Sequence, residues 1–139
     1  MMPYRHLLVV LLLLCSSVAF GEVIQANSLR AQDDGNGVVL RWTSVDETGV
    51  AGYMVERKAG GSGNFVPLVS QALQVKGNNQ NYLFEDETAF RTTGTFYQYR
   101  ITPVNSVGTP VGSSYYVSID HNNVSSVRRT WGSIKAMFR

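Results

Sequence analysis

The feature that most constrains the fold of this chain is a series of short segments in which apolar and polar residues alternate, separated by clusters of turn-forming residues. Alternation with a period of two is typical of a strand with one buried face. We expect seven strands, at residues 24–31, 38–43, 53–58, 65–69, 81–85, 97–104 and 114–119. Regular spacing of this kind predicts an all-β fold, a seven-stranded antiparallel β-sandwich.

The alternation also predicts which side chains form the core. Along each segment, every second residue should point toward the opposite sheet. The predicted core residues are Leu40, Trp42, Tyr53, Val55, Tyr97, Tyr99 and Ile101.

Four motifs carry a resemblance to a known family. They are Val38-x-Leu40-x-Trp42, Gly52-Tyr53-x-Val55-x-Arg57, Tyr82-x-Phe84-x-Asp86, and Gly94-Thr95-x-Tyr97-x-Tyr99-Arg100-Ile101-x-x-Val104-Asn105-x-x-Gly108. This pattern resembles the fibronectin type III family over most of residues 24–119. The resemblance implies that Trp42 is the core tryptophan and that the Tyr97 hydroxyl bonds back to the chain leading into its strand. Pro103 departs from the pattern, since it falls within a central strand, where we expect a bulge or an early strand end.

The first 21 residues have the organisation of a secretory signal peptide. Arg5 precedes an apolar run at residues 7–14, and small residues follow. We expect cleavage after Gly21, with cleavage after Ala19 or retention as an anchor as alternatives. Cys15 follows a leucine, which disfavours a lipid-modified cysteine. Since Cys15 lies in the leader, the mature chain has no cysteine and hence no disulfide. The predicted destination is extracellular or periplasmic, with association to the envelope left open.

The last twenty residues differ from the sandwich at residues 22–119. Residues 22–119 hold seven Lys or Arg against nine Asp or Glu, whereas residues 120–139 hold four against one. The apolar residues of this segment recur at helical spacing, so it is a short amphipathic, basic tail. It either packs back or frays, or it contacts a membrane surface, a protein or a sorting receptor. The candidate interaction residues are Arg128, Arg129, Trp131, Ile134, Lys135 and Phe138.

Catalytic machinery is sparse in the mature chain. His121 is the one imidazole and there is no thiol, so nucleophile and base triads lack their parts. Carboxylates cluster at residues 33–34, 46–47 and 85–87, where we expect solvated loop charges and turn caps. Asp33, Asp34 and Asn36 lack the ligand spacing of a calcium loop. The chain is therefore predicted to be no enzyme, with no catalytic, cofactor or metal site.

These observations favour a non-catalytic binding or interaction module. Tyr115 and Tyr116 are adjacent, so one should point outward, and Phe96 lies opposite the core row. The partner is an unknown protein, a polysaccharide or a membrane surface, and no nucleic acid is expected. One alternative is a passive sandwich whose tail serves in membrane attachment or export sorting. A second alternative, less favoured, is a hydrolase that uses paired carboxylates.

Overall fold

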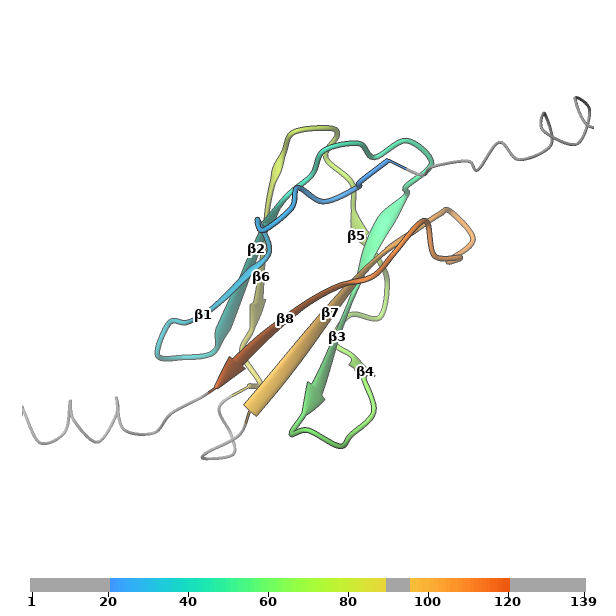
Figure 1. The fold of residues 1–139 in the computed structure, drawn as a ribbon. Helices are drawn as coiled ribbons and strands as arrows, with labels where there is room; N and C mark the ends of the chain where they lie inside the picture. The colour runs from blue at the N-terminus through green and yellow to red at the C-terminus, as the bar shows by residue number, and fades with distance from the viewer. Residues whose placement is uncertain (1–20, 90–95, 121–139) are drawn as a thin grey trace, which may run out of the picture.

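The computed structural model describes residues 21–89 and 96–120, which form two antiparallel β-sheets without a helix (Figure 1). The smaller sheet has the strand order β1-β2-β6, and the larger has the order β4-β3-β7-β8, with β5 also paired to β3. The strands are β1 (Arg30–Asp33), β2 (Val38–Thr43), β3 (Gly52–Ala59), β4 (Val66–Pro67), β5 (Leu73–Gln74), β6 (Asn81–Asp86), β7 (Phe96–Val104) and β8 (Tyr115–Asp120). The all-β architecture predicted from the alternation is confirmed. The described residues hold eight strands, however, one more than predicted.

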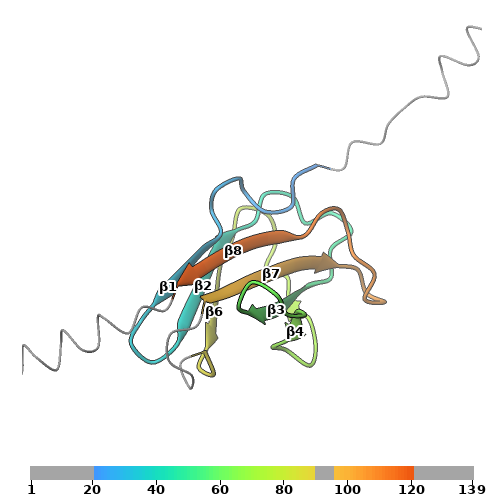
Figure 2. The ribbon, with the colours of Figure 1, turned by 60° about the horizontal axis from the view of Figure 1, so that its bottom comes forward.

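The two sheets face one another, as the turned ribbon of Figure 2 shows, and a single cluster of buried residues fills the core between them. All seven residues predicted for the core are buried. Its aromatic centre is formed by Trp42, Tyr53 and Tyr82, where Trp42 stacks on Tyr82 with ring centroids 5.2 Å apart. Tyr53 meets both rings edge-on, at 5.7 and 5.0 Å. Each buried side chain of this size contributes roughly 1.5 to 3 kcal/mol to the stability of the fold.

The first strand lies further along the chain than the predicted segment at 24–31. Asn27 has a φ of 61°, a left-handed conformation that interrupts an extended strand. Ser28 then donates its N–H to the carbonyl of Gln25, which closes a turn. Ile24 therefore forms only an isolated bridge with Ser44, and the continuous pairing begins at Arg30.

The connection between β3 and β6 contains two strands of two residues each. The expected strand at 65–69 is reduced to β4, because Pro67 lacks an N–H and can only accept in the ladder. Sequence alternation did not predict β5, since two residues are too few to establish a period. Both short strands pair with β3 and cover part of its edge.

Pro103 ends neither β7 nor its pairing with β3, so the expected bulge or early strand end is wrong. The register of β3 and β7 is continuous from Gly52 opposite Val104 to Ala59 opposite Tyr97. The Pro103 carbonyl accepts from the N–H of Val111, so this residue directs its hydrogen-bonding edge away from β3. The ladder between β7 and β8 ends at Ile101 opposite Tyr115. The missing N–H of Pro103 therefore falls beyond the end of the β7–β8 ladder, where no hydrogen bond to β8 is lost.

Candidate functional site

The outward face of the larger sheet carries a row of side chains that crosses four strands. Arg100 of β7 lies opposite Glu56 of β3 on one side and opposite Tyr116 of β8 on the other. Glu56 in turn lies opposite Pro67 of β4. We call these four residues the outer row. Residues directly opposite one another in antiparallel strands have Cβ atoms only about 5 Å apart, so the row is one continuous surface.

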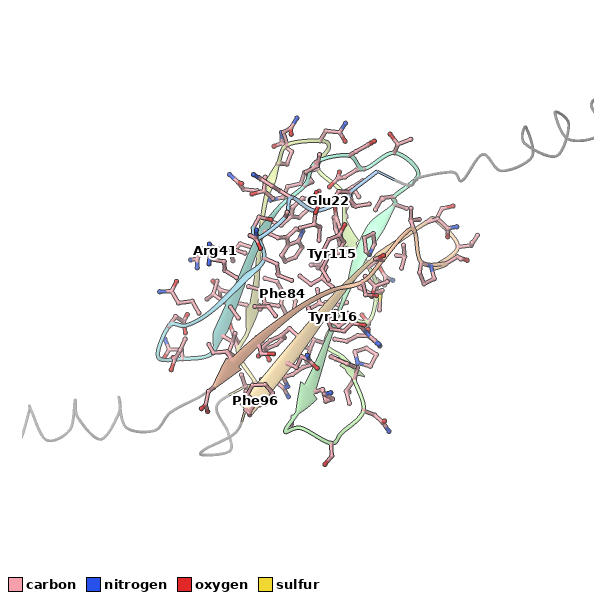
Figure 3. All side chains as sticks on the ribbon, viewed as in Figure 1. Glu22, Arg41, Phe84, Phe96, Tyr115 and Tyr116 are labelled. Atoms are coloured by element: carbon pink, nitrogen blue, oxygen red, sulfur yellow. The ribbon has the colours of Figure 1, made fainter. Side chains whose placement is uncertain are left out.

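Aromatic rings lie within this row and near it. The ring of Phe65, next to β4, has its centroid 6.0 Å from that of Tyr116. Tyr116 is 55% exposed and Phe96 is 40% exposed. Tyr115 and Tyr116 are adjacent on β8 (Figure 3) and differ as the alternation predicts. The Tyr115 hydroxyl accepts from the backbone N–H groups of Val23 and Ile24, whereas Tyr116 faces solvent.

Two cations surround the Phe65 ring. The Arg100 guanidinium carbon lies 4.3 Å from the ring centroid, and the Lys58 ammonium nitrogen lies 5.1 Å from it. Arg100 Nε also donates to Glu56 Oε2 at 2.6 Å. This hydrogen bond raises the pKa of Arg100, with a smaller contribution from Tyr116. Because the pair is partly exposed, we expect it to orient side chains more than to stabilise the fold.

A shallow groove of about 320 Å³ adjoins the outer row. Thr102 and Ser114 line it, with their hydroxyls hydrogen-bonded to each other at 2.8 Å, and Glu56 and Arg100 line it as well. The remaining lining residues are Met54, Val104, Gly108 and Pro110. The groove therefore combines hydroxyls, a paired charge and a few apolar groups.

The wall of the groove is a braced turn between β7 and β8. The Asn105 side-chain oxygen accepts from the N–H groups of Val107 and Thr109, at 3.1 and 2.9 Å. Asn105 N–H also donates to the Thr109 carbonyl, and Gly108, at a φ of 85°, takes the left-handed position that this turn requires. The groove is thus held in shape before any ligand arrives.

Glu47 is not the solvated loop charge that we predicted. It is 8% exposed, and its carboxylate accepts hydrogen bonds from the hydroxyls of Tyr53 and Tyr82 and from the Gly77 N–H. Burial, with the hydrogen bond to Glu47 second, raises the pKa of Tyr82 to about 12. The same two causes raise the pKa of Tyr53. No feature of the local sequence at 46–47 distinguishes Glu47 from the exposed Asp46, because its donors lie on β3, on β6 and in the turn before β6.

Asp86 also contradicts the expectation of a solvated charge at 85–87. It is 3% exposed, and its Oδ2 accepts from Arg57 at 2.5 Å and from the Tyr99 hydroxyl at 2.8 Å. Its Oδ1 accepts from the N–H and the hydroxyl of Thr88. Burial alone would raise the pKa of Asp86, but the donors from Thr88, Tyr99 and Arg57 outweigh it and lower the pKa. Arg57 is the last residue of one sequence motif and Asp86 is the last residue of another. Their opposite charges at these two motif positions are the signal that could have revealed the pair.

The acidic turn between β1 and β2 has the local geometry expected of turn caps. Asp33 Oδ1 accepts from the Gly35 N–H, and Asp34 Oδ1 accepts from the N–H groups of Asn36 and Gly37. Such contacts are ordinary for Asp in tight turns. Within residues 21–89 and 96–120, no three His, Cys, Asp or Glu side chains are grouped so that they could hold a metal ion.

Several predicted features lie outside the described residues. These are residues 1–20 of the predicted signal peptide, which include Cys15, then His121, and the six candidate interaction residues of the tail, Arg128, Arg129, Trp131, Ile134, Lys135 and Phe138. The backbone that would accept from Tyr97 also falls in the undescribed segment 90–95, so that hydrogen bond stays a prediction. In the described part of the chain, no helix has the length and apolarity to cross a bilayer.

In comparisons with known proteins, no family model, no curated protein and no solved structure matches the chain.

Proposed function

We propose that this chain is an exported, non-catalytic binding module of the fibronectin type III type, and that it contacts its partner through the outer face of the β4-β3-β7-β8 sheet. The export follows from the apolar leader at residues 7–14 and the small residues after it. The face comprises the outer row with Phe65 and Lys58 beside it, and Phe96 four residues before Arg100 on β7.

The sheet arrangement supports the family assignment. A three-stranded sheet packs on a larger one, and the strands of the sequence motifs occupy β2, β3, β6 and β7. Trp42 lies at the aromatic centre of the core, as the resemblance implies, and Tyr97 is buried at the start of β7. Fold alone does not fix a function, so the binding proposal depends on the surface.

The observation that carries the binding proposal is the exposed Tyr116 beside Phe65 and Arg100. Aromatic residues and arginine are enriched where protein surfaces bind partners, while scattered exposed aromatics are common on any surface. Here the rings are contiguous, and Arg100 is fixed by Glu56 and by the Phe65 ring. Fixed side chains lose less entropy on binding than free ones.

The buried carboxylates support a non-catalytic role. A hydrolase needs an acid and a base that can reach substrate. Glu47 and Asp86 are the carboxylates with the most unusual surroundings, and both are enclosed by hydroxyl, guanidinium or backbone donors. These donors account for the burial of the two carboxylates.

Site-specific photo-crosslinking in the exported protein tests this proposal. A photoreactive phenylalanine analogue would replace Tyr116 in one protein and Leu83, which is 53% exposed on β6 of the other sheet, in a matched control. We expect a discrete crosslinked product at position 116, reduced at least fivefold by Arg100→Glu, and none at position 83. Equal products at both positions, or none at either, would contradict a binding role for this face.

A second candidate function follows from the charge of the tail. Four basic residues and an apolar set at helical spacing are typical of a segment that attaches to a membrane surface or is recognised for sorting. In that case removal of residues 126–139 changes the cell fraction in which the protein is found. An unchanged distribution argues against this candidate and leaves the first one standing.

A further inference from the structure

The groove beside the outer row has a chemical character of its own. Its lining includes the hydrogen-bonded hydroxyls of Thr102 and Ser114 and the paired ions Glu56 and Arg100. Tyr116, opposite Arg100, adds an exposed ring at the margin. The groove thus offers a set of donors and acceptors next to a flat apolar surface.

The size of the face argues against a large partner surface. The strands β4, β3, β7 and β8 have two, eight, nine and six residues. At a spacing of about 4.8 Å between strands, they give a face on the order of 400 Å². A stable protein interface needs roughly 800 Å² from each partner. A groove of about 320 Å³ lies at the small end of the range for ligand sites, roughly 300 to 1,000 Å³. The occupant should therefore be a narrow chain or a small unit of one.

The lining also disfavours a protein anchor. A protein hot spot inserts a large side chain into a fully desolvated apolar pocket. Here the two rings, Phe65 and Tyr116, pack against each other, and the adjacent groove is shallow, with four polar or charged residues and four apolar ones in its lining. These groups match a ligand with many hydroxyls along its edge and an apolar face for the ring of Tyr116.

We propose that the groove between the outer row and the β7–β8 turn binds a pyranose unit of a polysaccharide chain, with the sugar face on Tyr116. This rests on the proposed binding function of the outer face and names its ligand class. The sugar hydroxyls would exchange hydrogen bonds with Thr102 and Ser114 on one side and with Glu56 and Arg100 on the other. The Asn105-braced turn holds the wall in place, so little ordering is needed on binding.

Neutral and acidic sugar chains share this pyranose chemistry, and Lys58 offers a means to distinguish them. Its ammonium lies over the Phe65 ring, and Lys58 follows Glu56 of the outer row by two residues on β3. If a uronate chain is the ligand, Lys58→Gln weakens binding and added salt does the same. If a neutral chain is the ligand, neither change has an effect.

The test is binding of the mature full-length chain to a panel of immobilised pyranose oligosaccharides, neutral and uronate, followed by calorimetric titration of the best ones. We expect Tyr116→Ala to weaken binding at least tenfold, Tyr116→Phe to preserve it within about threefold, and Thr102→Val to weaken it by an intermediate factor. Leu83→Ala on the other sheet is the control and should have no effect.

Two results would overturn the inference. One is an absence of binding across the whole panel, and the other is sugar binding that Tyr116→Ala leaves intact. If the unchanged chain crosslinks to a protein at position 116 but binds no sugar of the panel, the polysaccharide inference fails and the proposed binding function stands. Loss of the crosslink as well would remove the proposed function with it.

Discussion

The hydroxyl of Tyr53 donates a hydrogen bond of 2.7 Å to Oε1 of Glu47, inside the core and six residues away in sequence. Tyr82 donates to the same oxygen, and the Gly77 N–H donates to Oε2 at 2.8 Å. The Glu47 N–H itself donates to the Asn78 side chain. One carboxylate thereby ties the β2–β3 loop to β3, to β6 and to the turn before β6.

Replacing Glu47 tests this role. In Glu47→Gln an amide NH₂ replaces one acceptor oxygen and meets a donor, so a buried hydrogen bond is lost. We expect the free energy of unfolding to fall by about 1 to 3 kcal/mol in urea denaturation. The exposed Glu87→Gln is the matched control and should change it by less than about 0.5 kcal/mol. Equal stability of the two variants would contradict a structural role for Glu47.

Asp86 makes the stability of the fold sensitive to acid. Its pKa in the folded chain lies below the ordinary value of 3.8, so its contribution is present above that value and is lost as the pH falls through the folded pKa. We expect Asp86→Asn to be less stable at neutral pH by about 2 kcal/mol, and to lose less stability between pH 5 and acid than the parent. Thermal unfolding followed across pH measures both effects. A parallel acid profile in parent and variant would argue against the assignment.

Tyr82 gives a corresponding sensitivity to alkali. Its pKa is raised from 10.0 to about 12, first by burial and then by the hydrogen bond to Glu47. Because the pKa of Tyr82 is higher in the folded chain than in the unfolded chain, its protonated hydroxyl stabilises the fold below pH 10. This stabilisation is lost as the pH rises through about 12. In Tyr82→Phe we expect the tyrosinate absorbance step near pH 12 to shrink and the alkaline loss of stability to become shallower. An unchanged titration would show that the step belongs to another tyrosine.

Gly52 lies at a position where the backbones approach too closely for a side chain. A Cβ there would be 2.6 Å from the Ala72 Cβ and 2.8 Å from the Leu73 carbonyl oxygen, which lie just before and within β5. We expect Gly52→Ala to separate β3 from β5 and to cost about 1 to 3 kcal/mol. Gly61→Ala is the control, because no atom lies within 4 Å of its Cβ. Similar melting temperatures for the two variants would contradict this packing.

Much of the fold could be predicted where a strand is long and alternates without interruption. The segment 38–43 is β2 as predicted, and β7 begins within one residue of its predicted start. The first strand was misplaced because a single left-handed residue, Asn27, interrupts it, and asparagine does not reveal that conformation by its type alone. Strand β5 has no period of its own and exists through its contact with β3.

The candidate site was predictable only in part. Alternation indicates that Phe96 and one of the neighbours Tyr115 and Tyr116 point outward. It does not show that Tyr116, Arg100, Glu56 and Pro67 form one row, because that depends on the register of four strands. The burial of Glu47 and Asp86 was missed for the same physical reason, since Tyr53, Tyr82 and Arg57 reach them from other strands.

The most direct test of binding through the outer face is the yield of crosslinked product from a photoreactive residue at Phe65, measured in three forms of the exported protein. The forms are the unchanged chain, a chain that ends after Asp120, and Arg100→Glu. We predict that the yield persists without the tail and falls at least fivefold in Arg100→Glu. A yield that is lost with the tail and retained in Arg100→Glu would contradict the proposal and assign the binding to residues 121–139.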